Sequence, residues 1–520
     1  MKYSRSKWLL LVLAIVMCVS LFAGCSNNSA SDDNNNVKPA EETKAPPAKE
    51  AEPATAEPTV AEPTEIEIMV MTFQEPPDLN NEYYTELQKM TNTKLNITWV
   101  PDADYDTRFD LVLASGDIPE VIIAKSYSRP TLTQALDNNV FWDLTPLLGD
   151  FSKFPNLKDK QTPGSWKYVE YKGKIMGIPR SRSLIDSGIK IRKDWLEELN
   201  IPAPTTLDEF TEALKKIAAA KPGVSATVMD PFSNSGSIWV AYGVTDPTFD
   251  SEGGMIRDIL TPQFADMVEW FRGLYAAGLM PKEFTALNNN QKFDLMTTGK
   301  AASIDYGIYR DHTWTADLQK IDPKAQLFTL APLQGPKNLG AQLDIGTRGG
   351  IYISKKVPEE KALKILEYFD KTASDEVTDL AYYGKEGVHH TVVDGQPMLN
   401  DLGKEQIQVT ALNPLSPAYR KWGKVQYSGV SKAVNEAKFK EVEKYEEVGV
   451  INPFRWLYSQ AWTDAWPEFD STFQSNVLKA TVGDMSMDAF RKYQEDLRNN
   501  ADLKVAFQEF AEDYKARGSQ

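Results

Sequence analysis

Strand-like and helix-like segments alternate where the folded part of this chain begins. Residues 65–71 alternate apolar and polar side chains, as a half-buried strand does, and residues 79–90 space their apolar side chains as a helix does. The same order returns with a strand-like segment at 95–100, a helix-like segment at 105–114 and an apolar strand at 121–124. Repeated strand–helix units favour an α/β fold in which a mostly parallel sheet carries helices on both faces.

Specific residues mark helix boundaries farther along the chain. The segment Thr206–Glu209 has the capping-box pattern and predicts a helix that runs to about residue 220. Thr261–Pro262 predicts the start of another helix, and Gly278 predicts its end. Further short strands are expected at 301–305, 326–330 and 350–353. The last hundred residues are expected to be mostly helical.

The N-terminus has the pattern of an export signal. A basic cluster precedes the apolar run Leu9–Phe22, which is too short to span a bilayer comfortably as a mature anchor. Ala23 and Gly24 then stand before Cys25, an arrangement that resembles the bacterial lipobox. We expect residues 1–24 to be a lipoprotein signal peptide and Cys25 to carry a lipid such as palmitate. An ordinary signal peptide with an incidental cysteine is the alternative.

Residues 25–64 are expected to form a disordered tether. Polar residues follow the cysteine, and Glu-Pro and Ala-Pro steps follow these, with almost no large apolar side chain. Such a segment cannot bury enough apolar surface to fold, and it would let a globular body stand off the membrane. The body, residues 65–520, is long enough for two or three domains. It contains no cysteine, so no disulfide is expected within it.

The chain is strongly acidic, with a formal net charge of −16 at pH 7. An acidic body is repelled by nucleic acid and by anionic lipid. Nucleic-acid binding is therefore excluded, and a strongly anionic ligand would require a local group of basic side chains.

Four segments, taken in their order, resemble the extracellular solute-binding proteins (family 1) of carbohydrate ABC transporters. These segments are residues 113–123, 173–180, 191–202 and 298–302. The segment Tyr383–Thr391 is similar to the long lipoprotein members of that family from Gram-positive bacteria. The resemblance covers the whole body, and it implies that the protein is located on the extracellular face of a Gram-positive cell membrane.

The resemblance implies a two-lobed, type II periplasmic-binding-protein-like α/β fold that holds its ligand in a cleft between the lobes. The segments that cross between lobes are expected near residues 179–186, 331–340 and 373–387. The expected lobes are an N-terminal lobe of residues 65–182 plus 336–380 and a C-terminal lobe of residues 183–335 plus 381–520. Rotation about the crossing segments would close the cleft around a ligand.

The resemblance also points to a sugar as the ligand. Sugars present apolar C–H faces and many hydroxyl groups, so aromatic rings and planar polar side chains suit them. Most aromatic residues fill cores, and the residues of interest are those in loops expected to face the cleft. The expected ligand-binding residues are Arg180, Trp239, Tyr242, Tyr306, Tyr309, Arg310, Arg348 and His389. For at least one of His389 and His390 a purely structural role is expected.

Some members of the resembling family carry a calcium-binding loop near the position of residues 230–236. Here that stretch offers a single carboxylate, Asp230, and Pro231 and Phe232 stand where oxygen ligands would be needed. We therefore expect no metal site in this loop, and no cofactor.

The predicted function is binding without turnover. A monomeric lipoprotein would capture an oligosaccharide and deliver it to the permease subunits of an ABC importer. The identity of the sugar stays open. Arginines that would suit an acidic sugar such as a uronate are Arg180, Arg182, Arg310 and Arg348.

Two alternatives share the same export signal. One is a lipid-anchored carbohydrate-active enzyme with paired carboxylates, and the other is a lipoprotein that binds a peptide or another solute. The sequence has no nucleophile elbow, zinc motif or phosphate loop. The sequence has only three histidines, His312, His389 and His390, so few residues could serve in a histidine-based catalytic triad.

Overall fold

The computed structural model describes most of the body of the chain. The described residues are 62–517, with gaps at 73–74, 128, 163, 186, 408–414, 419–420, 422–424 and 428–429. They belong to one unit, Ala61–Gln520. The expected signal peptide, Cys25 and nearly all of the expected tether lie outside the described residues. None of the helices in the described part of the chain has both the length and the apolar character needed to cross a membrane.

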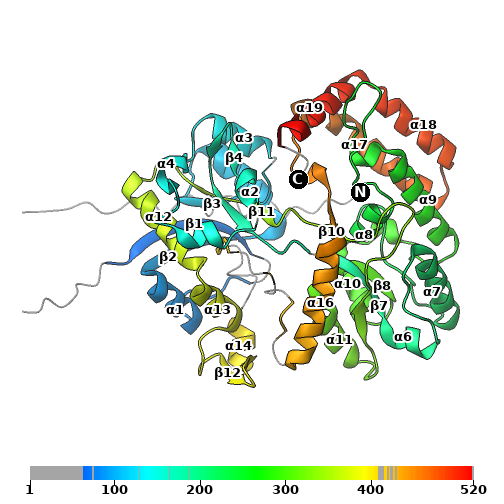
Figure 1. The fold of residues 1–520 in the computed structure, drawn as a ribbon, viewed down its shortest axis with the longest axis horizontal. Coiled ribbons are helices and arrows are strands. Elements are labelled where there is room, and N and C mark those ends of the chain that lie inside the picture. The colour runs from blue at the N-terminus through cyan, green and yellow to red at the C-terminus, as the bar shows by residue number, and fades with distance from the viewer. Residues whose placement is uncertain are drawn as a thin grey trace, which may run out of the picture. The chain divides into compact units, whose positions relative to one another are not determined.

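A five-stranded sheet in the order β2-β1-β3-β11-β6 forms the base of the first lobe (Figure 1). Its strands are β1 (Thr64–Thr72), β2 (Thr93–Pro101), β3 (Val121–Ile123), β6 (Ile178–Ser181) and β11 (Thr347–Ile353). β1 runs parallel to β2 over its whole length and parallel to β3, whereas β11 is antiparallel to both of its neighbours. The mostly parallel sheet predicted from the sequence is confirmed here, with β11 as the exception.

Helices cover both faces of this sheet. Its longer helices are α1 (Glu82–Thr91), α2 (Asp102–Ser115), α3 (Pro130–Asp137), α12 (Glu359–Thr372) and α13 (Asp375–Tyr383). α1, α12 and α13 contact one another, and α2 contacts α3, β1 and β2 (Figure 1). All three residues of β3 are buried, as expected of a strand with both faces covered. The resulting core includes Ile68, Val70, Phe109, Ile122 and Phe369.

Short elements complete the first lobe. They are α4 (Thr145–Leu148), α5 (Pro155–Asp159), η1 (Ser165–Tyr168), β4 (Glu170–Tyr171), β5 (Lys174–Ile175), β12 (His390–Val393), β13 (Gln396–Leu399) and α14 (Asp401–Gln406). Among them, η1 contacts β6 and therefore lies beside the sheet.

A three-stranded sheet in the order β8-β7-β9 forms the base of the second lobe. Its strands are β7 (Ser187–Arg192), β8 (Ser303–Gly307) and β9 (Leu327–Thr329). β7 is antiparallel to both neighbours, so the prediction of a mostly parallel sheet is wrong for this lobe. The reason lies in the route of the chain. β7 enters this lobe directly from β6 of the first sheet, whereas β8 follows α10 and β9 follows α11, and both run opposite to β7. β11 likewise enters the first sheet from the second lobe without a helix between them.

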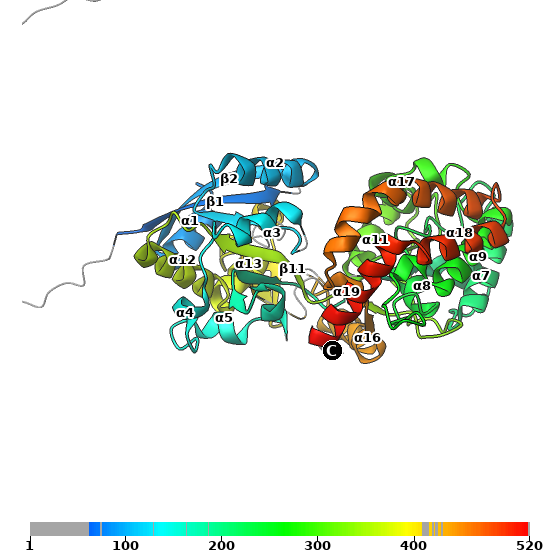
Figure 2. The same ribbon diagram turned by 90° about the horizontal axis from the view of Figure 1, so that it is seen from above.

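The rest of the second lobe is mostly helical. Its helices are α6 (Lys193–Glu198), α7 (Leu207–Ala220), α8 (Gly236–Ala241), α9 (Pro262–Ala276), α10 (Asn289–Thr297), α11 (Asp311–Gln319), α16 (Lys432–Val448), α17 (Gln460–Val482), α18 (Met487–Arg498) and α19 (Ala501–Arg517). Short elements are η2 (Asp258–Leu260), η3 (Phe284–Ala286), η4 (Ile308–Arg310), η5 (Pro453–Arg455), β10 (Gln342–Leu343) and β14 (Val450–Ile451). α17 and α18 lie beside α9 (Figure 2), and Phe264, Phe271, Phe473 and Phe490 are buried there. The helical character predicted for the C-terminal hundred residues is confirmed.

Helices begin where the capping residues predict. Thr206 Oγ1 accepts a hydrogen bond from Glu209 N at 3.1 Å, and α7 then runs to Ala220. The Glu209 carboxylate accepts from the backbone of Thr205 at 2.8 Å, one residue earlier than a capping box requires. Thr261 caps α9, and Gly278 stands just beyond the end of that helix with a φ of +69°.

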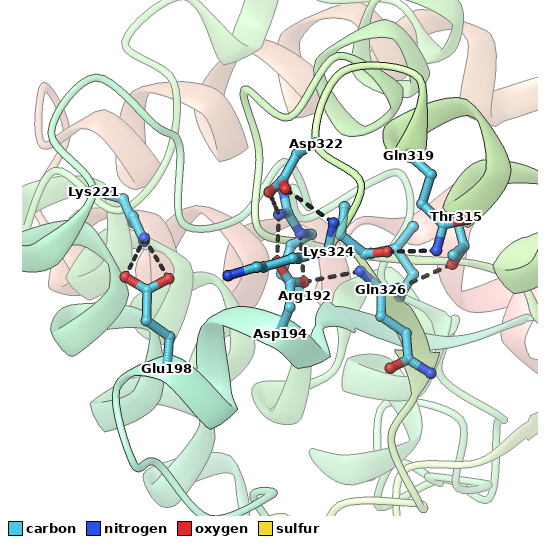
Figure 3. Close-up of polar contacts among 11 residues, drawn as sticks. Arg192, Asp194, Glu198, Lys221, Thr315, Gln319, Asp322, Lys324 and Gln326 are labelled. Atoms are coloured by element: carbon cyan, nitrogen blue, oxygen red, sulfur yellow. Dashed lines mark hydrogen bonds and ion pairs between the residues drawn. The ribbon is translucent and has the colours of Figure 1, made fainter.

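Arg192 ties β7 to α6 and to the chain that precedes β9 (Figure 3). Its Nε and Nη2 donate to the two carboxylate oxygens of Asp194 at 2.8 and 2.5 Å, and Nη2 lies 3.3 Å from Asp322. The guanidinium carbon lies 3.9 Å from the ring centroid of Trp195. Segment 191–202, one of the four that carry the family resemblance, therefore has a packing role in this lobe.

The packing divides the chain between the lobes differently from the expected boundaries at two places. Ile407 and Leu415 are buried in the core of the first lobe, beyond the crossing expected near residues 373–387. Ala341 packs with Val442 and Tyr445 of α16, so this part of the chain still belongs to the second lobe, beyond the boundary expected at 335/336. A boundary depends on which core each side chain reaches, and the local sequence does not show that.

Candidate ligand-binding site

A cavity of about 590 Å³, here called the first cavity, is lined by residues from two distant parts of the chain. One part is the loop after β3 together with η1 and the start of β11. The other is the segment Phe454–Gln460 that leads into α17. The loop after β3 lies at the carboxyl end of a parallel strand, the usual place for ligands of α/β sheets. The volume is in the range of small-ligand pockets.

Two tyrosines form one wall of the first cavity. The rings of Tyr127 and Tyr168 are stacked with their centroids 5.9 Å apart. The Tyr127 hydroxyl lies 2.5 Å from the carbonyl oxygen of Gly349 and 2.7 Å from Thr347 Oγ1. Burial raises the pKa of Tyr127 above its ordinary value, so the phenol is neutral at pH 7. These contacts hold the ring in one orientation at the cavity wall.

Arg348 lies on the first cavity with its side chain half exposed. Its Nε is 3.5 Å from Asp344 Oδ2, and its carbonyl oxygen accepts a hydrogen bond from Arg180 Nε at 2.8 Å. The next residue, Gly349, has a φ of +71°, and a Cβ there would lie 1.7 Å from the carbonyl oxygen of Ala124. Only glycine allows this backbone approach, which places Arg348 beside the loop that follows β3.

The opposite lining of the first cavity comes from the segment before α17, which α19 holds in place. The ring of Phe454 meets that of Phe510 edge-on at 5.2 Å. The backbone N–H of Tyr458 donates to Asp513 Oδ2 at 3.0 Å. Trp456 and Tyr458 thereby line the cavity on a segment fixed by the C-terminal helix.

A second cavity of about 440 Å³ lies in the second lobe and shares Phe454 and Arg455 with the first. Trp239 and Tyr306 are among its lining residues. Trp239 Nε1 donates to the carbonyl oxygen of Pro231 at 2.9 Å. The rings of Tyr306 and Trp314 are stacked at 5.7 Å with an interplanar angle of 7°. Contacts with other parts of the protein thus hold the side chains of Trp239 and Tyr306 in place.

The loop 230–236, which leads into α8 and lines the second cavity, is closed by a buried ion pair. Asp230 pairs with Lys292 of α10, and its Oδ1 also accepts from the backbone N–H groups of Phe232 and Ser233, each at 2.8 Å. Lys292 Nζ donates to Ser233 Oγ at 2.5 Å as well. The ammonium group therefore neutralises the single carboxylate of this loop.

The structure brings three of the eight expected site residues to the two cavities. Arg348 lines the first, and Trp239 and Tyr306 line the second. Arg180 lies behind the first cavity, where burial lowers the pKa of its guanidinium to about 10. Tyr242 packs against Trp270 at 6.4 Å.

The remaining expected residues line neither cavity. Tyr309 carries the guanidinium of Arg310 over its ring at 5.3 Å. His389 is fully buried, accepts from Lys385 N at 2.9 Å through Nδ1, and lies 3.1 Å from Gln406 Oε1 through Nε2. An amide oxygen can only accept, so His389 is the neutral Nε2–H tautomer and its ring is satisfied by the protein.

Sequence reasoning missed several lining residues, among them Lys125, Tyr127, Tyr168, Arg257, Arg455, Trp456 and Tyr458. Tyr127 carried a usable signal, because it follows a predicted parallel strand and the ends of such strands meet ligands. The dense aromatic sequence around Trp456 was another signal. Arg257 and Arg455 are almost 200 residues apart, and only the packing of the C-terminal helices brings them together.

No group of three or more metal-ligating side chains is present among the described residues.

Two α/β lobes with a cavity lined by both define a two-lobed ligand-binding protein. The chain belongs to the family of bacterial extracellular solute-binding proteins, whose sequence model matches residues 82–380. As predicted, it is a solute-binding protein and not an enzyme, and its α/β class and type II fold are confirmed.

Similar proteins match most of the chain. The polygalacturonan/rhamnogalacturonan-binding protein YtcQ of Bacillus subtilis (strain 168) is 27% identical over 532 residues, which span 98% of this chain and 99% of YtcQ. Lipoprotein LipO of the same strain is 26% identical over 514 residues, 94% of each chain. The crystal structure of the alginate-binding protein AlgQ2 without calcium ion covers 88% of this chain and 99% of its own, with a TM-score of 0.63 and 18% identity. At that identity the likeness concerns the fold alone.

Proposed function

We propose that this protein is the lipid-anchored receptor of an ABC importer and captures an oligosaccharide in the two adjoining cavities. The observation that carries the proposal is the first cavity, where Tyr127 and Tyr168 of the first lobe and Trp456 and Tyr458 of the C-terminal segment line one space. Aromatic rings pack well on the C–H faces of sugars, and their hydroxyl and indole groups can pair with sugar hydroxyls. Rotation of the lobes would bring both sets of rings onto the ligand.

The extent of the site favours more than one sugar unit. The two cavities adjoin at Phe454 and Arg455, and each has aromatic lining of its own, with Trp239 and Tyr306 in the second. A chain of sugars could therefore place one unit on the Tyr127 side and another beside Trp239. The name of YtcQ, which refers to polysaccharides, supports a carbohydrate ligand.

The location and the partners follow from the same proposal. The family is extracellular, and the lipobox-like sequence before Cys25 together with the name of lipoprotein LipO supports attachment through a lipid on Cys25. The expected monomer would present both lobes to the permease. The permease would then bind the closed form of the protein, in which the lobes have rotated together around the ligand. The tether of residues 25–64 would give the body the reach to do so.

Calorimetric titration of the purified protein with a panel of neutral and acidic oligosaccharides tests the proposal. We expect one class to bind and to be recovered intact. A bound ligand at a hundred times its dissociation constant would also stabilise the fold by about 2.7 kcal/mol. Recovery of cleaved sugar would favour the enzyme alternative. If no oligosaccharide of the panel binds, a peptide or another solute would be favoured as the ligand.

Trp456 offers a matched pair of variants for the same titration. Trp456→Ala should weaken the binding of the sugar about tenfold or more, because the cavity loses a large aromatic surface. Phe249→Ala is the control, since Phe249 is exposed, contacts Tyr514 and lines neither cavity. Equal affinity in the Trp456 variant and the wild type would mean that the ligand does not occupy the first cavity.

A further inference from the structure

Two arginines from distant parts of the chain meet at the second cavity. Arg257 precedes η2, and Arg455 is the last residue of η5. Both line the second cavity, and Arg455 lines the first cavity as well. Two guanidinium groups thus line one cavity of a chain that has a net charge of −16.

Arg257 is held in place by aromatic rings. Its guanidinium carbon lies 4.4 Å from the ring centroid of Phe454 and 5.5 Å from that of Trp462. Its Nη1 lies 2.9 Å from Asp258 Oδ1, while Asp258 Oδ2 accepts from Asn452 Nδ2 at 2.7 Å. Burial and the nearby charge of Arg455 both lower the pKa of Arg257. The planar group is therefore pre-positioned, and it lies close enough to Arg455 to be repelled by it.

Arg455 is the second cation on this cavity. Its side chain is exposed, and within the described part of the chain no carboxylate forms an ion pair with it. The second cavity is lined by two carboxylates. Asp258 is engaged by Arg257, and Asp305 accepts from the backbone N–H of Ser237 at 2.6 Å. The cavity thus offers guanidinium N–H groups of Arg455 for a ligand. Beside them lies Arg257, a cation that is fixed in place and paired in part with Asp258.

We propose that Arg257 and Arg455 together bind a carboxylate of the ligand, so that the captured oligosaccharide contains uronate units. This inference rests on the proposed function and adds the substrate class. Guanidinium groups pair with carboxylates through parallel N–H···O bonds, which gives both affinity and a defined orientation. Trp239 and Tyr306, on the same cavity, are placed to contact the ring that carries the carboxylate.

The same arrangement discriminates against neutral sugars. When the lobes close on a ligand, Arg455 loses water, and a neutral sugar supplies no charge to replace it. Leaving a cation without a partner in a desolvated site is costly, whereas a carboxylate relieves the repulsion between the two arginines. Arg348 and Arg310 lie outside the second cavity, since Arg348 lines only the first cavity and Arg310 lines neither.

The test compares acidic oligosaccharides with their own neutral derivatives. Oligogalacturonates and oligomannuronates are titrated into the full-length protein in detergent, together with the same oligomers after reduction of each carboxylate to a primary alcohol. We expect at least one acidic series to bind about tenfold or more tightly than its reduced form, and to lose affinity as salt increases. Equal binding of acidic and reduced forms overturns the inference and leaves the proposed function intact, whereas failure of every oligomer to bind overturns both.

Variants assign the effect to the arginine pair. Arg455→Gln should remove most of the preference for the acidic oligomer and reduce its salt dependence, while the reduced oligomer binds as before. Arg455 is exposed, so this variant is expected to fold normally. Arg257→Lys, which keeps the charge but loses the planar donor group, should also weaken acidic binding. Arg310→Gln is the matched control and should keep the preference for the acidic oligomer. If Arg455→Gln keeps this preference to the same extent as Arg310→Gln, the assignment to the arginine pair is overturned.

Discussion

Asp311 is the centre of a buried charge cluster in the second lobe. Its Oδ1 lies 2.7 Å from Lys190 Nζ on β7, and its Oδ2 lies 2.8 Å from Lys438 Nζ on α16. Thr329 of β9 also donates to Oδ2 at 2.8 Å. Burial alone would raise the pKa of Asp311, but the attraction of two ammonium groups outweighs it and holds that pKa below its ordinary value. One carboxylate therefore joins α16 to the sheet.

Asp311→Asn should be strongly destabilising. We expect the free energy of unfolding at pH 7 to fall by about 3–5 kcal/mol, because the buried Lys190 loses its counter-charge and the buried Lys438 keeps only Glu441, at 2.6 Å. Urea denaturation followed by circular dichroism measures this loss. Asp317→Asn on the same helix is the control, since Asp317 pairs with Lys320 at the surface and should contribute about 0–1 kcal/mol. An unchanged urea midpoint for Asp311→Asn would show that the cluster contributes no net stability.

The same carboxylate predicts a pH dependence. Its pKa in the folded protein lies below the value of about 3.9 expected in the unfolded chain. Its contribution to stability is therefore fully present above that pH and is lost as the pH falls through the folded pKa. The stability of the wild type should decline in this acidic range, and Asp311→Asn should lack that part of the decline.

At the scale of elements, a loop and a helix are joined by the pair of Asp230 and Lys292. α10 supplies Lys292, and the loop 230–236 carries lining residues of the second cavity up to α8. A protein cation that neutralises the loop carboxylate leaves little reason for a metal ion to bind there. We therefore expect Lys292 to be a positioning residue, which would act on a ligand through the loop.

Lys292→Met should weaken ligand binding about tenfold while the protein remains folded. The variant leaves Asp230 buried without its ammonium partner, so the loop should lose its fixed position. Binding is measured by calorimetry, and thermal unfolding is followed in parallel. Lys300→Met, at an exposed position after α10, is the control and should change neither quantity.

Calcium should not shift the unfolding temperature of the wild type, and a clear shift would contradict the prediction of no metal in this loop.

Local signals predicted the elements better than their arrangement. Thr206 and Thr261 cap their helices as expected, because capping involves only neighbouring residues. The direction of β7 was not predictable in this way. It depends on the route by which the chain enters the sheet, and the sequence of a strand is compatible with either direction.

At the scale of the whole molecule, attachment to the membrane is predicted to depend on Cys25. Cys25→Ser should move the protein from the membrane fraction of cells to the medium, because a lipid chain would supply the anchorage. Immunoblots of the fractions and labelling with radioactive palmitate measure the change. Cys18→Ser is the matched control, since this second cysteine lies in the expected signal peptide and should leave the distribution unchanged. Retention of the Cys25→Ser protein on the membrane would contradict lipid attachment at this residue.

The sequence by itself determined the α/β class, most element positions and the family, because these depend on periodicity, on neighbouring residues and on short ordered segments. Two of the side chains predicted from local patterns, Trp239 and Tyr306, line the second cavity. Only the tertiary structure decided which side chains share a cavity. Arg257 and Arg455 meet because α17 and α19 pack back onto the second lobe, and Arg180 is removed from the site because β6 is buried. Such outcomes depend on contacts between residues far apart in the chain, which no local pattern records.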